Sequence, residues 1–136
     1  MKPRYMLDTS ICIYLMKHQP PEVAVRFASC YVGDVVISAI TLAELEYGVT
    51  CSGEAQAQNR AALDSLLEEI IAVPFESEAA REYGPMRQLT RERKRDALDR
   101  LIAAHATALD TILVTNNEAD FQIYPDLKVE NWVVEH

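Results

Sequence analysis

Arg4-Tyr5-Met6-Leu7-Asp8-Thr9-Ser10 is a short apolar run that ends in a carboxylate followed by two hydroxyls. A run of this kind, followed at once by a helical pattern, predicts a buried strand of a parallel sheet. Ligands of open parallel sheets bind just beyond the carboxyl ends of the strands, so Asp8 stands where chemistry would be placed. Asp and Ser are also favoured helix N-caps, and a plain capping role for Asp8 or Ser10 stays open at this point.

The rest of the chain alternates strands with helices. Continuous β-branched or apolar runs predict further strands at residues 35–38, 70–75, 111–115 and 127–134. Periodic apolar residues predict helices at 11–17, 22–30, 41–49, 54–69, 77–93 and 98–108, with an interruption at Gly84-Pro85 and a short helix near 116–121. This alternation predicts an α/β fold with a mostly parallel sheet of about five strands.

Size and composition fit one soluble domain over residues 1–136. With 136 residues, of which 49% are hydrophobic and 25% charged, the chain can bury a sizeable core. No apolar run approaches the roughly 20 residues of a membrane span, and residues 1–15 lack the apolar core of a signal peptide. We therefore expect a cytoplasmic protein that does not bind membranes.

Charge is distributed unevenly along the chain. The net charge of -8 argues against non-specific nucleic-acid binding by the whole surface. Seven of the 13 Lys and Arg residues nevertheless form a basic run between positions 81 and 100: Arg81, Arg87, Arg91, Arg93, Lys94, Arg95 and Arg100. The sequence leaves open whether this basic run is a solvated helix face or a phosphate-binding patch.

Acidic side chains gather at one edge of the predicted sheet. Asp8 ends the first strand and Glu44 follows the second, while Asp120 follows the strand at 111–115 and Asp99 begins the helix that leads into it. Carboxylates placed together repel one another unless a cation lies among them. Oxygen ligands without a matching set of His or Cys indicate Mg²⁺ or Mn²⁺ rather than zinc.

Several of these groups also have a plain structural interpretation. Thr41-x-x-Glu44 matches the capping box of a helix start, which would occupy the Glu44 carboxylate. The hydroxyls of Thr9, Ser38 and Thr115 can close strand-to-helix turns equally well. The pattern of residues alone does not decide between these roles and chemistry.

Four motifs follow one another along nearly the whole chain. They are Met6-Leu7-Asp8-Thr9-Ser10, Ile37-Ser38-x-x-Thr41-x-x-Glu44-Leu45-x-x-Gly48, Asp99-x-x-Ile102-Ala103-x-x-Ala106 and Leu113-Val114-Thr115-Asn116-Asn117-x-x-Asp120-Phe121. Together they resemble the PIN-domain ribonucleases and, within these, the VapC toxins of bacterial toxin–antitoxin pairs. The resemblance implies a three-layer α/β/α domain, an endoribonuclease that depends on Mg²⁺ or Mn²⁺, a homodimer, and inhibition by a VapB-like antitoxin whose tail occupies the active-site groove.

The resemblance also implies roles for single residues. Asp8, Glu44 and Asp99 match core acidic positions of the family and would hold the metal. Many relatives have a further acidic residue where this chain has Asn117, and Asp120 could supply that catalytic carboxylate instead. On this hypothesis a metal bound by Asp8 and Asp99, with Glu44 direct or through water, activates a water that hydrolyses an RNA phosphodiester bond.

Other side chains would support this site. Thr9, Ser38, Thr115 and Asn117 are candidates for contacts to the scissile phosphate or to the metal ligands. The basic run could hold RNA phosphates if it borders the cleft. His105, on an apolar helix face, is expected to pack in the core or an interface, and Trp132 in the core or at an edge.

Two other functions fit the pattern less well. A phosphatase or phosphoacceptor domain needs a second Asp two residues after the first or a Lys after a late strand, and this chain has Ser10 and Asn116-Asn117 there. A catalytically silent PIN-like module that binds RNA or a partner is the alternative function. It is disfavoured because packing intact carboxylates together without a metal costs stability. The sequence does not determine the RNA, the number of metals or the dimer surface.

Overall fold

One sheet of five parallel strands organises the computed structural model, which describes residues 2–93 and 97–134. The strands are β1 (Tyr5–Leu7), β2 (Val35–Ser38), β3 (Ile71–Val73), β4 (Ile112–Val114) and β5 (Lys128–Glu130). Their order across the sheet is β3-β2-β1-β4-β5, and every neighbouring pair is parallel. The predicted α/β fold is confirmed, and the sheet is parallel throughout.

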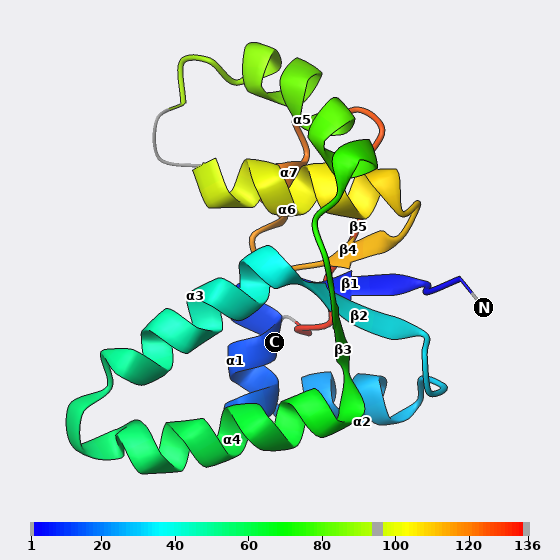
Figure 1. Cartoon of the computed structure of the whole chain (residues 1–136). Coiled ribbons are helices and arrows are strands. Elements are labelled where there is room, and N and C mark those ends of the chain that lie inside the picture. Colours follow the sequence, from blue (N-terminus) through cyan, green and yellow to red (C-terminus); the bar gives the residue numbers. More distant parts are fainter. Residues whose placement is uncertain (1, 94–96, 135–136) are drawn as a thin grey trace.

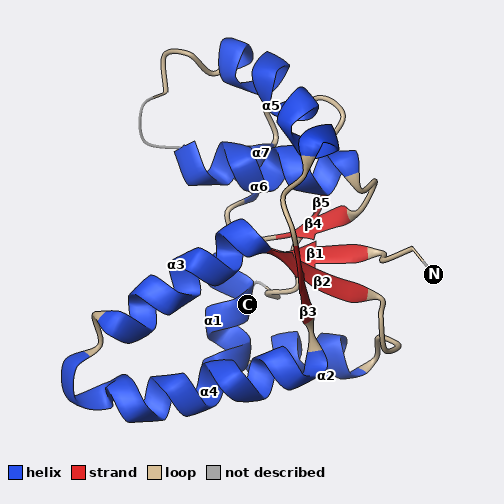
Figure 2. Cartoon of the chain, viewed as in Figure 1, coloured by secondary structure: helices blue, strands red, loops and turns tan. Residues whose placement is uncertain are grey.

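Helices cover both faces of this sheet (Figure 1). They are α1 (Thr9–Lys17), α2 (Pro21–Ala28), α3 (Ala39–Thr50), α4 (Gln56–Glu69), α5 (Ser77–Leu89), α6 (Ala97–Ala108) and α7 (Glu118–Phe121). Figure 2 shows α5 and α6 on one side of the strands and α1 to α4 on the other, which gives the expected three layers. None of the described helices is long and apolar enough to cross a membrane.

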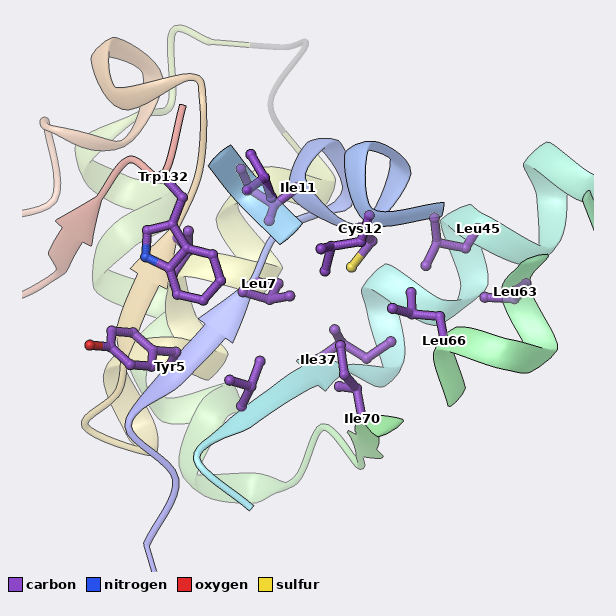
Figure 3. Close-up of a cluster of buried hydrophobic side chains, with 14 of the residues drawn as sticks. Tyr5, Leu7, Ile11, Cys12, Ile37, Leu45, Leu63, Leu66, Ile70 and Trp132 are labelled. Carbon is purple, nitrogen blue, oxygen red and sulfur yellow. The ribbon is translucent and has the colours of Figure 1, made fainter. Parts of the chain in front are cut away.

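The alternation of side chains along the strands divides the core in two. Leu7 and Ile37 face the helices α1 to α4, whereas Met6 and Val36 face α6 on the opposite side. Figure 3 shows the first of these clusters, with Leu7 and Ile37 on the strands and Leu45 on α3. Side chains of this kind, fully buried, each contribute about 1.5–3 kcal/mol, so both faces of the sheet hold the fold together.

The strand order reverses between β1 and β4. From β1 the chain moves outward to β2 and β3, and it then returns to the other side of β1 as β4 and β5. Such a switch point leaves a crevice at the carboxyl ends of the two central strands. Asp8 follows β1 and Thr115 follows β4 at this place, and the Asp8 N–H donates to the Val114 carbonyl at 3.0 Å.

Helix α5 differs from its prediction at two points. It continues through Gly84-Pro85 without interruption, because its packing against α6 compensates for the missing proline N–H. It ends at Leu89, although the sequence predicted a helix up to Arg93. The Thr90 hydroxyl donates to the Met86 carbonyl at 2.8 Å and helps to close the last turn.

The last strand is also shorter than predicted. It ends at Glu130 instead of residue 134, because the Asn131 side chain accepts the Val133 N–H at 2.9 Å and turns the chain. Trp132 then points inward, 3% exposed, with its ring 5.4 Å from that of Tyr5 (Figure 3). The expected packing role of Trp132 is confirmed.

Candidate active site

Asp8 lies at the switch point of the sheet and caps α1. Its Oδ1 atom accepts the Ile11 N–H at 3.1 Å and the Ser10 hydroxyl at 2.7 Å. The residue is 5% exposed, and this burial raises the pKa of the Asp8 carboxyl although hydrogen bonds from Thr115, Ser10 and Ile11 act in the opposite direction. Asp8 is therefore the cap, and Ser10 is its partner. A carboxylate that caps a helix still has lone pairs for a ligand.

Thr115 joins the ends of the two central strands. Its hydroxyl is hydrogen-bonded to the Asp8 carboxylate, and its oxygen also accepts the Asn117 N–H at 2.9 Å. Thr115 is fully buried, so its hydroxyl orients Asp8 from inside the fold. Asn117, which precedes α7, is exposed at the same edge.

Glu44 is held by the first helix and has no capping role. Helix α3 starts at Ala39, because the Ser38 hydroxyl accepts the Ile40 N–H at 3.0 Å and caps the helix earlier than predicted. The predicted Thr41–Glu44 capping box is therefore wrong. The half-buried Glu44 accepts instead the Thr9 hydroxyl on Oε1 at 2.9 Å.

Asp99 and Asp120 come from the other side of the sheet. Asp99 lies in the first turn of α6 and is half-buried. Asp120 is exposed on α7, where its N–H donates to the Asn117 carbonyl at 3.0 Å. The Asp120 carbonyl accepts a hydrogen bond of 3.4 Å from Arg93, which brings the end of the α5 segment to α7.

The carboxylates share an edge of the sheet but do not form a closed cluster. Among residues 2–93 and 97–134, no group of three or more His, Cys, Asp or Glu side chains could hold a metal ion as it stands. The ion pairs formed between those same residues do not include Asp8, Glu44 or Asp120. Like charges that lack a counter-ion favour such an open arrangement. The available donors are oxygens, the ligand type that Mg²⁺ and Mn²⁺ prefer.

Two cavities adjoin α1. One, of about 220 Å³, is lined by Thr9 and Glu44 on its polar side and by Ile13 and Val49 among its apolar residues. The other, of about 460 Å³, lies between α1, α2 and α4, and both cavities are lined by Met16. Apolar surface therefore continues from the carboxylates along the outside of α1.

The basic run does not form one surface. Arg100 is only 5% exposed, and its guanidinium donates to the Arg93 carbonyl at 2.8 Å, so this side chain stabilises the turn after α5. Arg93 donates a hydrogen bond to the Asp120 carbonyl, so the Arg93 side chain lies beside the carboxylates. Lys94 and Arg95 lie outside the described residues.

Ser38 and His105 form a buried pair that sequence reasoning missed. His105 Nδ1 lies 2.8 Å from Ser38 Oγ, and the two residues are 2% and 0% exposed. The expected core position of His105 is confirmed. For Ser38 the sequence left open a contact to a phosphate or a metal ligand and a role in closing the turn into the helix; its buried hydroxyl caps α3, which is the second of these. The two residues are 67 positions apart, and no local pattern in the sequence connects them.

Comparisons with known proteins agree on one family. Residues 5–127 match the PIN domain. Ribonuclease VapC2 of Rickettsia felis is 37% identical over 134 residues, which cover 94% of this chain and 97% of that protein. The tRNA(fMet)-specific endonuclease VapC of Shigella flexneri is 35% identical over 131 residues, covering 95% and 98%. The crystal structure of VapBC2 from Rickettsia felis bound to promoter DNA contains a chain that superposes with a TM-score of 0.84 at 35% identity, covering 95% of this chain and 98% of that chain.

Proposed function

This chain belongs to the VapC ribonucleases of the PIN domain family, the toxins of toxin–antitoxin pairs, and on that premise we propose that it hydrolyses RNA with a divalent metal at its carboxylate edge. The observation that carries the proposal is the buried Asp8 carboxylate at the switch point. Its partners Ser10, Ile11 and Thr115 are all uncharged donors. A buried carboxylate without a counter-ion is costly, and a bound cation would remove that cost.

Asp8, Asp99 and Glu44 are the residues that we propose hold Mg²⁺ or Mn²⁺. They fit such an ion because they offer oxygen donors and negative charge at one edge of the sheet. When bound, the ion supplies Lewis-acid stabilisation of phosphoryl oxygens and lowers the pKa of a nearby water.

The neighbouring side chains fix the orientation of these ligands. Ser10 and the Ile11 N–H both bind Oδ1 of Asp8, so the carboxylate cannot rotate freely. Thr9 holds Oε1 of Glu44, which leaves the second oxygen of that carboxylate for a ligand. Partners of this type commonly change metal affinity or activity by about 10–100-fold when they are removed.

The exposed groups of α7 complete the proposed site. We propose that Asp120 and Asn117 orient the water or the RNA, since Asn117 lies in the turn that follows β4 and Asp120 lies on α7, which begins directly after it. Arg93, hydrogen-bonded to the Asp120 carbonyl, is placed to contact an RNA phosphate beside them.

The RNA substrate and the protein partners are also proposals. Because a relative at 35% identity is named a tRNA(fMet)-specific endonuclease, initiator tRNA is the first substrate that we would test. We propose that a VapB-like antitoxin covers the cavity lined by Thr9 and Glu44, and the adjoining cavity between α1, α2 and α4, with an apolar segment. The exposed Leu89 and Leu98, on α5 and α6, support a homodimer because apolar surface of this kind favours self-association.

Cleavage of purified initiator tRNA and of total RNA tests the proposal. The wild-type protein is assayed with Mg²⁺ or Mn²⁺, with EDTA, and beside Asp8→Asn and Asp99→Asn variants. Discrete products that require the metal and both carboxylates support the proposal. Identical products from wild type and variants would point to a contaminating nuclease. No cleavage by a folded, antitoxin-free protein would favour a silent RNA-binding or partner-binding module.

A further inference from the structure

A buried line of hydrogen bonds runs from α3 to α6 and on to the segment after β3. Ser38 Oγ accepts the Ile40 N–H at 3.0 Å, so its single proton is free to be donated to His105 Nδ1, 2.8 Å away. His105 also bonds to the backbone of Pro74, which has no N–H and can only accept. The imidazole therefore accepts on Nδ1 and donates from Nε2.

The surroundings keep this arrangement of protons. Burial lowers the pKa of His105, so the ring is neutral at physiological pH. A neutral ring with one donor and one acceptor nitrogen matches the Pro74 carbonyl and the Ser38 hydroxyl. Both ends of the imidazole thus hold a specific partner.

The line of hydrogen bonds lies where two site helices meet. Ser38 caps α3, which carries Glu44 six residues later, and Asp99 on α6 lies six residues before His105. Six residues span about 9 Å along a helix, so a small change at the bond is carried to both carboxylates. In Figure 1, the first turn of α3 lies close to the middle of α6. From there α3 runs to the lower left, and the first turn of α6 also lies on the left.

We propose that His105 is a positioning residue that, through Ser38, sets the separation of Glu44 from Asp99. This inference rests on the proposed function, because it matters only if these carboxylates share a metal. It assigns His105 a role in the site although the side chain is buried and reaches neither RNA nor solvent.

Two substitutions separate the two ends of the imidazole. In His105→Asn the side-chain amide lies near the position of Nδ1, so it can still accept the Ser38 hydroxyl. In His105→Gln the amide lies near Nε2, so it can reach Pro74 but leaves Ser38 without a partner. Each variant keeps one buried hydrogen bond and loses the other, which makes them a matched pair.

The test measures Mn²⁺ affinity by calorimetry on RNA-free protein, and kcat and KM for RNA cleavage separately. We expect His105→Gln to weaken Mn²⁺ binding about tenfold and to lower kcat by a similar factor, with little change in KM. His105→Asn should recover most of both losses. Ser38→Ala breaks the same bond and also removes the cap of α3, so it should lose at least as much as His105→Gln, and the double variant should lose no more than Ser38→Ala alone.

Thr111→Val is the control for general loss of stability. It removes the buried hydrogen bond of 3.2 Å from the Thr111 hydroxyl to the Ala106 carbonyl, which does not connect α6 to α3, and should leave Mn²⁺ affinity unchanged. If the wild type is active and the Gln and Asn variants lose Mn²⁺ affinity and kcat equally, this inference is overturned while the proposed function stands. A wild-type protein that neither binds Mn²⁺ nor cleaves RNA would overturn the proposed function and this inference with it.

Discussion

The two edges of the sheet hold an aspartate in opposite ways. At the amino edge, Asp110 lies between Lys2 at 2.7 Å and Lys128 at 2.8 Å, and these lysines lower the pKa of its carboxyl to about 2. At the carboxyl edge, Asp8 is surrounded by uncharged donors, and burial raises its pKa. The charge of Asp110 is thus compensated by two lysines, whereas the charge of Asp8 has no such partner among the residues that the structure describes. The comparison indicates that the amino edge serves the fold, and it supports the proposal that the carboxyl edge binds a cation.

Replacing each aspartate by asparagine gives the sharpest test of this difference. Asp8→Asn keeps a good N-cap but removes the charge, and we expect RNA cleavage to fall more than a hundredfold, which corresponds to over about 2.7 kcal/mol. In metal-free buffer the variant should be more stable than wild type, because a raised carboxyl pKa means that the charged form destabilises the folded state above that pKa. Steady-state cleavage and urea unfolding in EDTA measure the two effects. Retained cleavage would remove Asp8 from the site.

Metal binding should stabilise the folded chain through Asp8 at the carboxyl edge of the sheet and not through Asp110 at the amino edge. At a concentration of Mn²⁺ about a hundred times the dissociation constant, we expect the free energy of unfolding of wild type to rise by about 2.7 kcal/mol. Asp110→Asn should show the same increase, and Asp8→Asn should show almost none. Thermal unfolding with and without Mn²⁺ measures this, and an equal response of all three proteins would show that the ion binds elsewhere.

A smaller effect is expected from the partner of Glu44. Thr9→Val keeps the shape of the side chain but removes the hydroxyl that binds Oε1 of Glu44 at 2.9 Å. We expect kcat/KM for RNA to fall about tenfold, because the carboxylate is no longer held in place. Thr50→Val is the matched control, since the Thr50 hydroxyl only binds the Glu46 carbonyl on the exposed part of α3. Equal activity of the two variants would contradict a role for Thr9.

The smallest effect is expected at the amino edge. Asp110 has a backbone φ of +54°, which asparagine tolerates, so Asp110→Asn removes only the charge. Because exposed ion pairs contribute little, stability should fall slightly and cleavage should not change. The folded pKa lies below the unfolded value of 3.8, so the contribution is complete above that pH and is lost as the pH falls through about 2. Acid unfolding of the two proteins should therefore converge over that window, and a difference that grows toward low pH would contradict the assignment.

The parts of the site that follow from local pattern were predictable. The apolar run before Asp8 and the β-branched run before Thr115 identify two central strands, and the polar residues after them mark one edge of a parallel sheet. The role of Asp8 as N-cap and a role for it in chemistry were both present in the pattern; the structure confirms the first, and the second stays a prediction.

The parts that depend on distant contacts were not predictable. The capping box at Glu44 looked complete in the sequence, but Ser38 caps the helix earlier in the chain. The Glu44 carboxylate instead accepts a hydrogen bond from the Thr9 hydroxyl. Arg100 looked like part of a basic surface, yet it is buried in contact with the turn after α5. Helix α5 passes through Pro85 because packing against α6 outweighs a local preference. In each case a tertiary partner competes with a strong local signal.

The place of β1 in the middle of the sheet has a consequence for synthesis of the chain. Asp8 is made early, but its neighbours at the switch point belong to β4 and the turn after it, about a hundred residues later. At ribosomal rates of about 5–20 residues per second, the strand that completes the site emerges several seconds after the one that starts it. A nascent chain therefore carries Asp8 without Thr115 until about a hundred further residues have been added, and RNA near the ribosome that makes it meets an unfinished site.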